Sequence, residues 1–98
     1  MKFYLVNGTF TNRPDGAAFK DALDAHHAYW AQFIQTGKVL LCGPKTTGCG
    51  ILIVKCDADD SIDAMIAGDP FVERGIASFE ASEFKAFYKM PAIADWFE

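Results

Sequence analysis

The sequence predicts an α+β fold built on a four-stranded antiparallel sheet, and three observations support this prediction. Two segments are apolar at both odd and even positions, which is typical of strands buried on both faces. One long segment carries apolar side chains three or four residues apart, the spacing of an amphipathic helix. Turn-forming residues separate these segments and give the order strand, helix, strand, strand, helix, strand.

The first strand and the first helix are expected in the first third of the chain. The strand spans Lys2 to Gly8, and the turn cluster Arg13-Pro14-Asp15-Gly16 follows it. The helix is expected from about Ala17 to Thr36, and Gly37 is placed to end it. One face of this helix carries a single stripe of side chains: Phe19, Leu23, His26, Trp30 and Phe33.

The second and third strands are expected to form a hairpin. They span Val39 to Gly43 and Ile51 to Cys56, and a glycine-rich loop from Gly43 to Gly50 connects them. This loop opens into a strand rather than a helix, so it is not a phosphate-binding loop of the usual kind. Its backbone amides could still bind an anion. The alternative is a plain flexible hairpin loop.

An acidic run precedes the second helix and consists of four aspartates: Asp57, Asp59, Asp60 and Asp63. Carboxylates at this position are expected to cap free amides and to suit the helix dipole. The longer pattern of a calcium loop, with its glycine and distal glutamate, is absent. Three side chains of this helix are expected to face inward: Ile62, Met65 and Ile66.

The chain after the second helix is expected to return to the sheet. Gly68 ends the helix, and Asp69-Pro70 begins a short turn that runs through Arg74. The fourth strand is expected from Gly75 to about Phe87. The last ten residues, Lys89 to Glu98, are too apolar for a free tail, so they are expected to pack on their own domain or across a dimer.

This order of elements is the ferredoxin-like βαββαβ arrangement, and residues 1–98 are expected to form one such domain. Two helices can cover only one face of a four-stranded sheet. The first and third strands, which are central in this topology, are nevertheless apolar on both faces. An uncovered face of that kind favours association, so a homodimer with two sheets packed face to face is expected.

Composition excludes several classes of function. The net charge is −4 and the basic residues are scattered, whereas nucleic-acid binding requires a clustered positive surface. The longest apolar runs are too short to span a membrane, and the N-terminus lacks the core of a signal peptide. A cytoplasmic protein is therefore expected.

The three cysteines are an odd number, which argues against a secreted disulfide framework. Cys42 and Cys56 lie in apolar runs and are expected to be buried and inert. Cys49 lies among glycines and is expected to be more exposed. No cysteine has a partner at the spacing of a metal site, so no metal ligand is expected.

The residues that could carry acid–base chemistry are His26 and Asp69. His26 lies on the apolar stripe, whereas the side chain of His27 points away from it. A histidine in that position is often a core residue whose N–H is satisfied, and an aspartate before a proline is often a helix cap. If the two side chains meet, the carboxylate fixes the imidazole tautomer and stabilises the imidazolium, which makes a general base near neutral pH.

Three segments resemble one known family. They are His26-His27-Ala28-Tyr29-Trp30, Gly37 to Pro44, and Asp69-Pro70-Phe71-Val72 with the following Gly75-Ile76. In this order they are similar to the YCII-related domain (YciI-like) family, over about residues 2 to 88. The resemblance implies a dimeric α/β barrel of ferredoxin-like subunits. It also implies an active site with a His–Asp dyad at His26 and Asp69, and a pocket rim at Gly43 and Pro44.

Two main hypotheses about function follow. The first is a small cofactor-independent enzyme of the lyase or isomerase type, in which His26 moves a proton on a small organic substrate and Asp69 orients His26. Tyr29, Trp30 and Phe71 are candidate walls of its pocket, and plain core packing is the alternative for each. The second is a non-catalytic ligand-binding or assembly module, in which Asp69 only satisfies a buried imidazole. A haem-handling or monooxygenase function rests on shared architecture alone.

Overall fold

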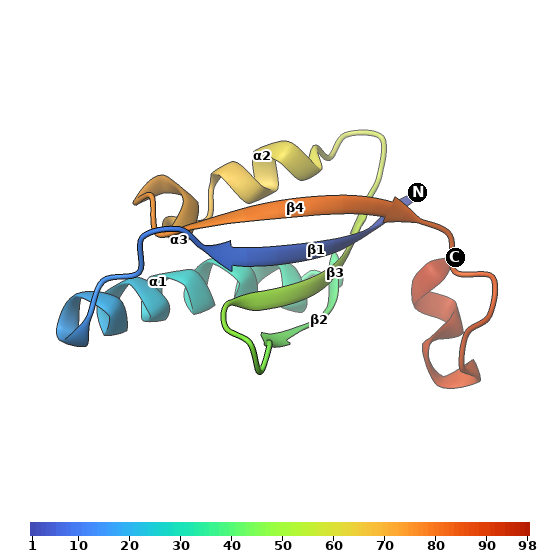
Figure 1. The fold of residues 1–98 in the computed structure, drawn as a ribbon. Coiled ribbons are helices and arrows are strands. Elements are labelled where there is room, and N and C mark those ends of the chain that lie inside the picture. The colour runs from blue at the N-terminus through green and yellow to red at the C-terminus, as the bar shows by residue number, and fades with distance from the viewer.

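The computed structural model describes residues 1–98 and has a sheet with helices on one side (Figure 1). The strands are β1 (Lys2–Phe10), β2 (Val39–Pro44), β3 (Gly50–Cys56) and β4 (Ala77–Phe84). The helices are α1 (Gly16–Gln35), α2 (Ile62–Ala67), α3 (Pro70–Glu73) and the 3₁₀ segment η1 (Pro91–Phe97).

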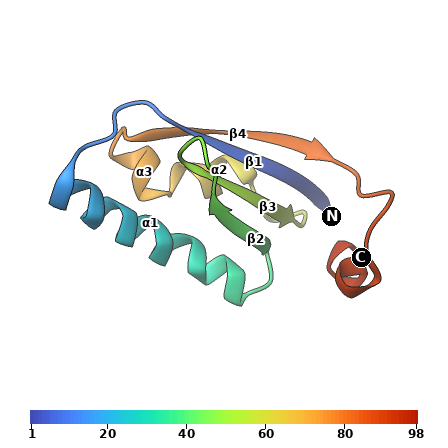
Figure 2. The ribbon, with the colours of Figure 1, turned by 60° about the horizontal axis from the view of Figure 1, so that its bottom comes forward.

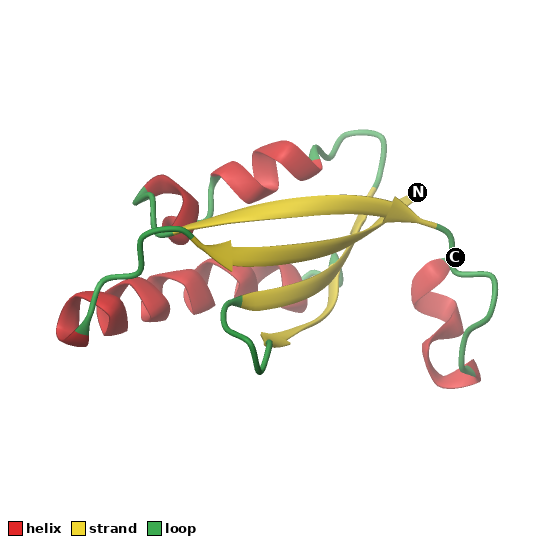
Figure 3. Ribbon diagram, in the orientation of Figure 1, coloured by secondary structure: helices red, strands yellow, loops and turns green.

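The sheet has the strand order β2-β3-β1-β4, and every neighbouring pair is antiparallel. The long β1 is central, where Val6 lies opposite Leu52 of β3 and Ala81 of β4. Two layers are visible in Figure 3, with α1, α2 and α3 against one face of the sheet. The prediction of an α+β, ferredoxin-like fold with a four-stranded antiparallel sheet is therefore confirmed.

The hydrophobic core lies between the sheet and the helices, in two clusters. The first contains Trp30 of α1 and the inward side chains of the sheet: Val6, Val39, Leu52, Val54 and Cys56, with Met65 of α2. The second lies toward the other end of β1 and contains Ala22, Cys49, Phe71, Ile76 and Ala77. The apolar stripe of α1 runs along both clusters, so this one long helix covers the whole core.

Helix α1 begins and ends within one residue of its predicted limits. Gly37 follows it with a φ of +80°, the left-handed conformation that glycine adopts without steric strain. This turn directs the chain into β2, and Lys38 then donates its backbone N–H to the carbonyl of Phe33.

Helix α2 corrects the prediction about the acidic run. Its N-cap is Ser61, whose hydroxyl accepts a hydrogen bond from the backbone N–H of Ala64 at 3.2 Å. Asp57 and Asp60 instead accept hydrogen bonds within the turn that precedes the helix. Asp63 alone lies in the first helical turn, where it suits the dipole.

The cysteine predictions are correct for one residue and wrong for two. Cys56 is buried, as expected. Cys42 is exposed because β2 is an edge strand and the thiol faces a cavity. Cys49 is buried because a left-handed backbone conformation, with φ 61°, turns it back from the loop into the second core cluster.

The C-terminal segment lies beside the end of the sheet where β1 begins and β4 ends (Figure 2). Strand β4 stops at Phe84, three residues before the predicted end. Segment η1 packs on its own chain, since Trp96 and Phe97 contact the ring of Phe3. The indole N–H of Trp96 also donates to the carbonyl of Gly37 at 2.7 Å. None of the helices is long and apolar enough to cross a membrane.

Candidate active site

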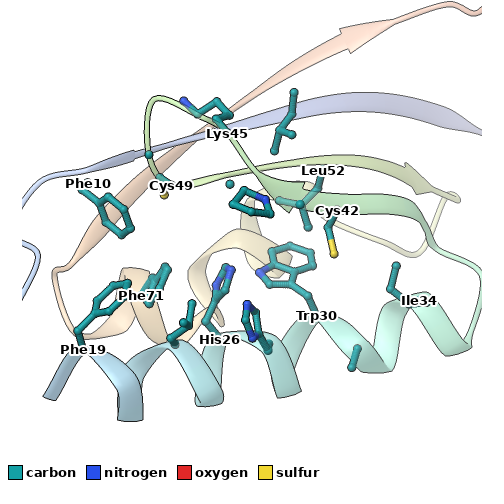
Figure 4. A pocket seen from close by; sticks show the side chains of 18 of the residues that line it. Phe10, Phe19, His26, Trp30, Ile34, Cys42, Lys45, Cys49, Leu52 and Phe71 are labelled. Atoms are coloured by element: carbon teal, nitrogen blue, oxygen red, sulfur yellow. The ribbon is translucent and has the colours of Figure 1, made fainter. Parts of the chain in front are cut away.

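A cavity of about 680 Å³ lies between α1 and the β2–β3 hairpin (Figure 4). Helix α1 forms one wall with side chains that include His26, Trp30 and Ile34. The hairpin forms the opposite wall from Cys42 to Leu52. Phe10, Phe19 and Phe71 close one end. The cavity is therefore mostly apolar, as small-molecule sites usually are.

His26 of α1 and Asp69 of the α2–α3 joint are in direct contact. The Nδ1 atom of His26 lies 2.9 Å from Oδ1 and 2.8 Å from Oδ2 of Asp69. The Asp69 side chain is 0% exposed and that of His26 is 13% exposed. The two residues that the sequence singled out are thus brought together from positions 43 residues apart in the chain.

The other contacts of Asp69 settle the tautomer of His26. Its carboxylate also accepts from the indole Nε1–H of Trp30 at 2.8 Å and from the backbone N–H of Phe71 at 2.9 Å. Both of these groups can only donate, so Asp69 acts as an acceptor throughout. The Nδ1 atom of His26 therefore carries a proton, so in the neutral ring the lone pair is on Nε2.

Local sequence explains why these groups converge. His26 and Trp30 are four residues apart on α1, so their side chains lie on the same face. Asp69 is the N-cap of α3, with Pro70 in the first turn. The sequence left two roles open for Asp69, a helix cap and a partner of His26. The structure shows both contacts, because one carboxylate caps α3 and also binds His26.

Phe71 fixes the plane of the imidazole. Its ring stacks on that of His26 with 4.1 Å between the centroids and 9° between the planes. No protein group hydrogen bonds to Nε2 of His26, and no buried side-chain nitrogen or oxygen is left without a partner. The free Nε2 is therefore accessible, on a ring that lines the cavity.

The remaining predicted site residues divide into two groups. Gly43, Pro44, Trp30 and Phe71 line the cavity. Tyr29 does not line the cavity, so the prediction that it forms part of the wall is wrong.

The hydroxyl of Tyr29 donates to the carbonyl of Met65 at 2.6 Å. A Cβ on Gly68 would lie 2.5 Å from this hydroxyl oxygen, so the joint before Asp69 accepts only glycine without rearrangement. Burial, followed by the nearby carboxylates of Asp69 and Glu73, raises the pKa of Tyr29. Tyr29 thus supports the backbone that presents Asp69.

Sequence reasoning missed part of the cavity wall. Arg13, Lys45 and Cys49 line it from two loops, and Phe10 and Phe19 complete its aromatic end. Phe19 was visible as a member of the helical stripe. The loop residues gave no comparable signal, because their contacts depend on how two separate turns fold over the sheet.

The chain shows no arrangement for a metal. No group of three or more histidine, cysteine, aspartate or glutamate side chains lies close enough to hold an ion. The carboxylate of Asp69 is already occupied by three N–H donors.

The buried thiols of Cys49 and Cys56 predict a loss of stability in alkali. Burial raises the pKa of both thiols above the ordinary value of 9.0. Above about pH 9 the unfolded chain therefore loses thiol protons that the folded chain retains. Below that pH these two thiols should cause no change in the free energy of unfolding with pH. The free energy of unfolding should fall as the pH rises toward the raised pKa values.

Urea unfolding between about pH 8 and 10 checks this expectation. The double variant Cys49→Ala, Cys56→Ala should show a shallower decline than the parent. Parallel curves for the two proteins would mean that the buried thiols do not set the alkaline limit.

Comparison with known proteins finds a matching family model and matching solved structures. Residues 4–85 match the family model of the YCII-related domain. Among solved structures, the chain is similar to the 5-chloro-2-hydroxyhydroquinone dehydrochlorinase of Burkholderia phenoliruptrix AC1100, in complex with 2,5-dihydroxybenzoquinone. That likeness has a TM-score of 0.60 and 21% identity, and covers 85% of this chain and 93% of the other, which shows a shared fold. No curated protein matches the chain.

Proposed function

We propose, since the chain belongs to the YCII-related domain family, that its cavity is the active site of a small acid–base enzyme. Its reaction is an elimination or isomerisation of a small organic substrate. His26 transfers the proton and Asp69 orients and stabilises His26. The chemistry needs no cofactor, because proton transfer at carbon requires only a base, an acid and a substrate that can stabilise the charge.

One observation carries the proposal, namely the state of the His26 ring. Its Nδ1–H is held by a fully buried carboxylate, its plane is held by Phe71, and its Nε2 lone pair is free. A histidine that serves only packing needs no accessible lone pair in an apolar cavity. This arrangement is suited to a general base, since Asp69 stabilises the imidazolium that forms when Nε2 takes a proton.

The proposed step is balanced in atoms and electrons. Nε2 of His26 removes a proton from a carbon or hydroxyl group of the substrate. The electron pair of the broken bond forms a new double bond, and in an elimination a leaving group departs from the neighbouring carbon with its own bonding pair. In an elimination the imidazolium then gives its proton to the leaving group or to water, so the net change is the loss of one acid molecule. In an isomerisation the proton returns to a different carbon.

The solved neighbour supports this class of reaction. That protein is a dehydrochlorinase of 5-chloro-2-hydroxyhydroquinone, so its reaction removes hydrogen chloride from a hydroxylated ring. The first test is therefore to supply this chain with 5-chloro-2-hydroxyhydroquinone and related small hydroxylated rings, in D₂O. Chloride release reports elimination, and exchange of a carbon-bound proton for deuterium reports base action even without product. Either signal above the rate without protein is the expected result.

The same screen can overturn the proposal. A compound that binds in the cavity, seen as shifted ring resonances of His26, should also react or exchange. Binding without any exchange or release, across the whole panel, would instead support a non-catalytic ligand-binding module.

We also propose that the chain forms a homodimer through the open face of its sheet. Leu41, Ile53 and Leu5 stand opposite one another across β2, β3 and β1 and form an apolar row. Leu41 is 50% exposed and Leu5 is 37% exposed, on the face that the helices do not cover. A second copy of the same sheet presents the same apolar row, so the two faces match in chemistry.

Light scattering after size exclusion, at micromolar concentration, tests the dimer. The parent should elute with the mass of two chains, and the double variant Leu5→Lys, Leu41→Lys should have the mass of one. The control is Ile34→Lys, which places the same charge on an exposed apolar site of α1 and should leave the mass of two chains. A parent with the mass of one chain would contradict the proposal.

A further inference from the structure

We infer that the cavity takes a flat, apolar ligand that carries one negative charge, and that Arg13 and Lys45 receive this charge. The inference rests on the proposed function only where it identifies that ligand as the substrate. The observation behind it is the distribution of charge around the cavity. Four of the lining residues are basic in character, namely Arg13, Lys45, His26 and His27, and none is an aspartate or glutamate.

This distribution runs against the composition of the chain. Acidic residues outnumber basic ones, 13 to 9, and the net charge is −4. The four ion pairs of the molecule involve Lys20, His26, Lys38 and Arg74, so His26 is the only basic lining residue that already contacts a carboxylate. Arg13 and Lys45 thus have no carboxylate partner. A cation beside an apolar cavity without a counter-charge is available to a bound anion.

Both cations lie at the aromatic end of the cavity. The guanidinium carbon of Arg13 is 4.0 Å from the ring centre of Phe19 and 5.3 Å from that of Phe10. A guanidinium held over a ring still presents the N–H groups on its edge, and no protein group accepts from those of Arg13.

Lys45 reaches the same end from the hairpin loop. Its Nζ donates to the carbonyl of Gly8 at 2.8 Å, close to the end of β1. An ammonium group has three donors, so this tether fixes its position and leaves two N–H groups free.

These positions define the ligand. Its charged group lies toward Arg13 and Lys45, and its flat body lies against the partly buried rings of Phe10 and Phe19. Phe71 is buried behind these rings and contacts both of them and the ring of His26, so Nε2 lies near a ligand held this way. A ring bearing a carboxylate, phenolate or enolate group has this chemistry. Such a charge also assists the proposed step, because the two cations stabilise the electron-rich intermediate that follows proton removal.

The test compares benzoate with benzamide, which has the same shape and no charge, by NMR titration of the intact protein. Benzoate should bind at least about tenfold more tightly than benzamide, because its carboxylate makes charge-assisted hydrogen bonds. The preference should decrease as salt is added. It should disappear in the double variant Arg13→Gln, Lys45→Met. Arg74→Gln, which removes an arginine outside the cavity, should retain it.

Several outcomes would overturn the inference. They are equal binding of the two probes, no benzoate binding at millimolar concentration, or a preference that survives in the double variant. The proposed function fails separately. His26→Gln should keep the preference for benzoate while it loses turnover, so retained turnover in that variant refutes the catalytic role of His26 and leaves the anion site intact.

Discussion

The variant His26→Gln is expected to lose about 10²- to 10⁴-fold in kcat on any substrate that the parent turns over. Glutamine keeps an N–H group that can donate to Asp69, so the buried carboxylate retains its partner. It has no group that takes up a proton near neutral pH. The loss should therefore appear in kcat rather than in KM, since the cavity wall is nearly unchanged. Steady-state kinetics and a thermal melt of the same preparation measure both effects.

The neighbouring histidine supplies a matched control. His27 lines the same cavity but has no carboxylate partner. His27→Gln should cause a much smaller loss of kcat than His26→Gln. Equal losses would show that either histidine only shapes the cavity, and an active His26→Gln would remove the proposed base altogether.

The fold was predictable from the sequence because its elements are set by local patterns. The helical stripe of α1, the turn at Gly37 and the doubly apolar β1 and β3 each have one simple structural solution. The end of β4 was predicted three residues too late, because Ala86 and Phe87 continue the apolar pattern beyond Phe84 but belong to the C-terminal tail. Two of the three cysteines were misplaced. Burial of a side chain on a short edge strand depends on what faces it, and Cys42 faces a cavity. Cys49 has a left-handed backbone conformation that turns it from the loop into the core.

The candidate site was predictable only in part. His26 and Asp69 could be singled out, since a histidine on an apolar stripe requires a partner and an aspartate before proline is a strong local signal. Their contact could not be derived, because it depends on the packing of α1 against the α2–α3 joint. The same holds for Trp30, whose indole N–H reaches Asp69, and for Arg13 and Lys45, which two distant loops bring to one end of the cavity.

Replacing Asp69 by alanine is expected to lower the free energy of unfolding by about 3–5 kcal/mol. Three donors would lose their acceptor at once, on His26, Trp30 and Phe71. Each donor left unsatisfied in a buried position costs about 1–3 kcal/mol, and the effects are not additive. Asp69 also joins the two core clusters, because Trp30 belongs to one and Phe71 to the other. Urea unfolding of Asp69→Ala against Ser61→Ala measures the difference.

Ser61 is the matched control because it caps α2 with one hydrogen bond, as Asp69 caps α3. Its loss should cost about 1 kcal/mol. An Asp69→Ala variant that is no less stable than Ser61→Ala would show that the carboxylate acts only as a cap.

The variant Asp69→Asn separates the two roles of this residue. The amide oxygen can still accept from the backbone N–H of Phe71, so part of the stability should remain. The amide N–H₂ group, however, donates to His26 and draws the proton of the imidazole to Nε2. His26 then has no lone pair directed at the substrate, and kcat should fall by up to about 10⁴-fold, as when a triad aspartate is replaced in this way.

Nitrogen NMR reads the tautomer directly, with Nε2 unprotonated in the parent and protonated in Asp69→Asn. An unchanged tautomer with reduced activity would mean that Asp69 acts through its charge alone, whereas unchanged activity would remove it from the mechanism.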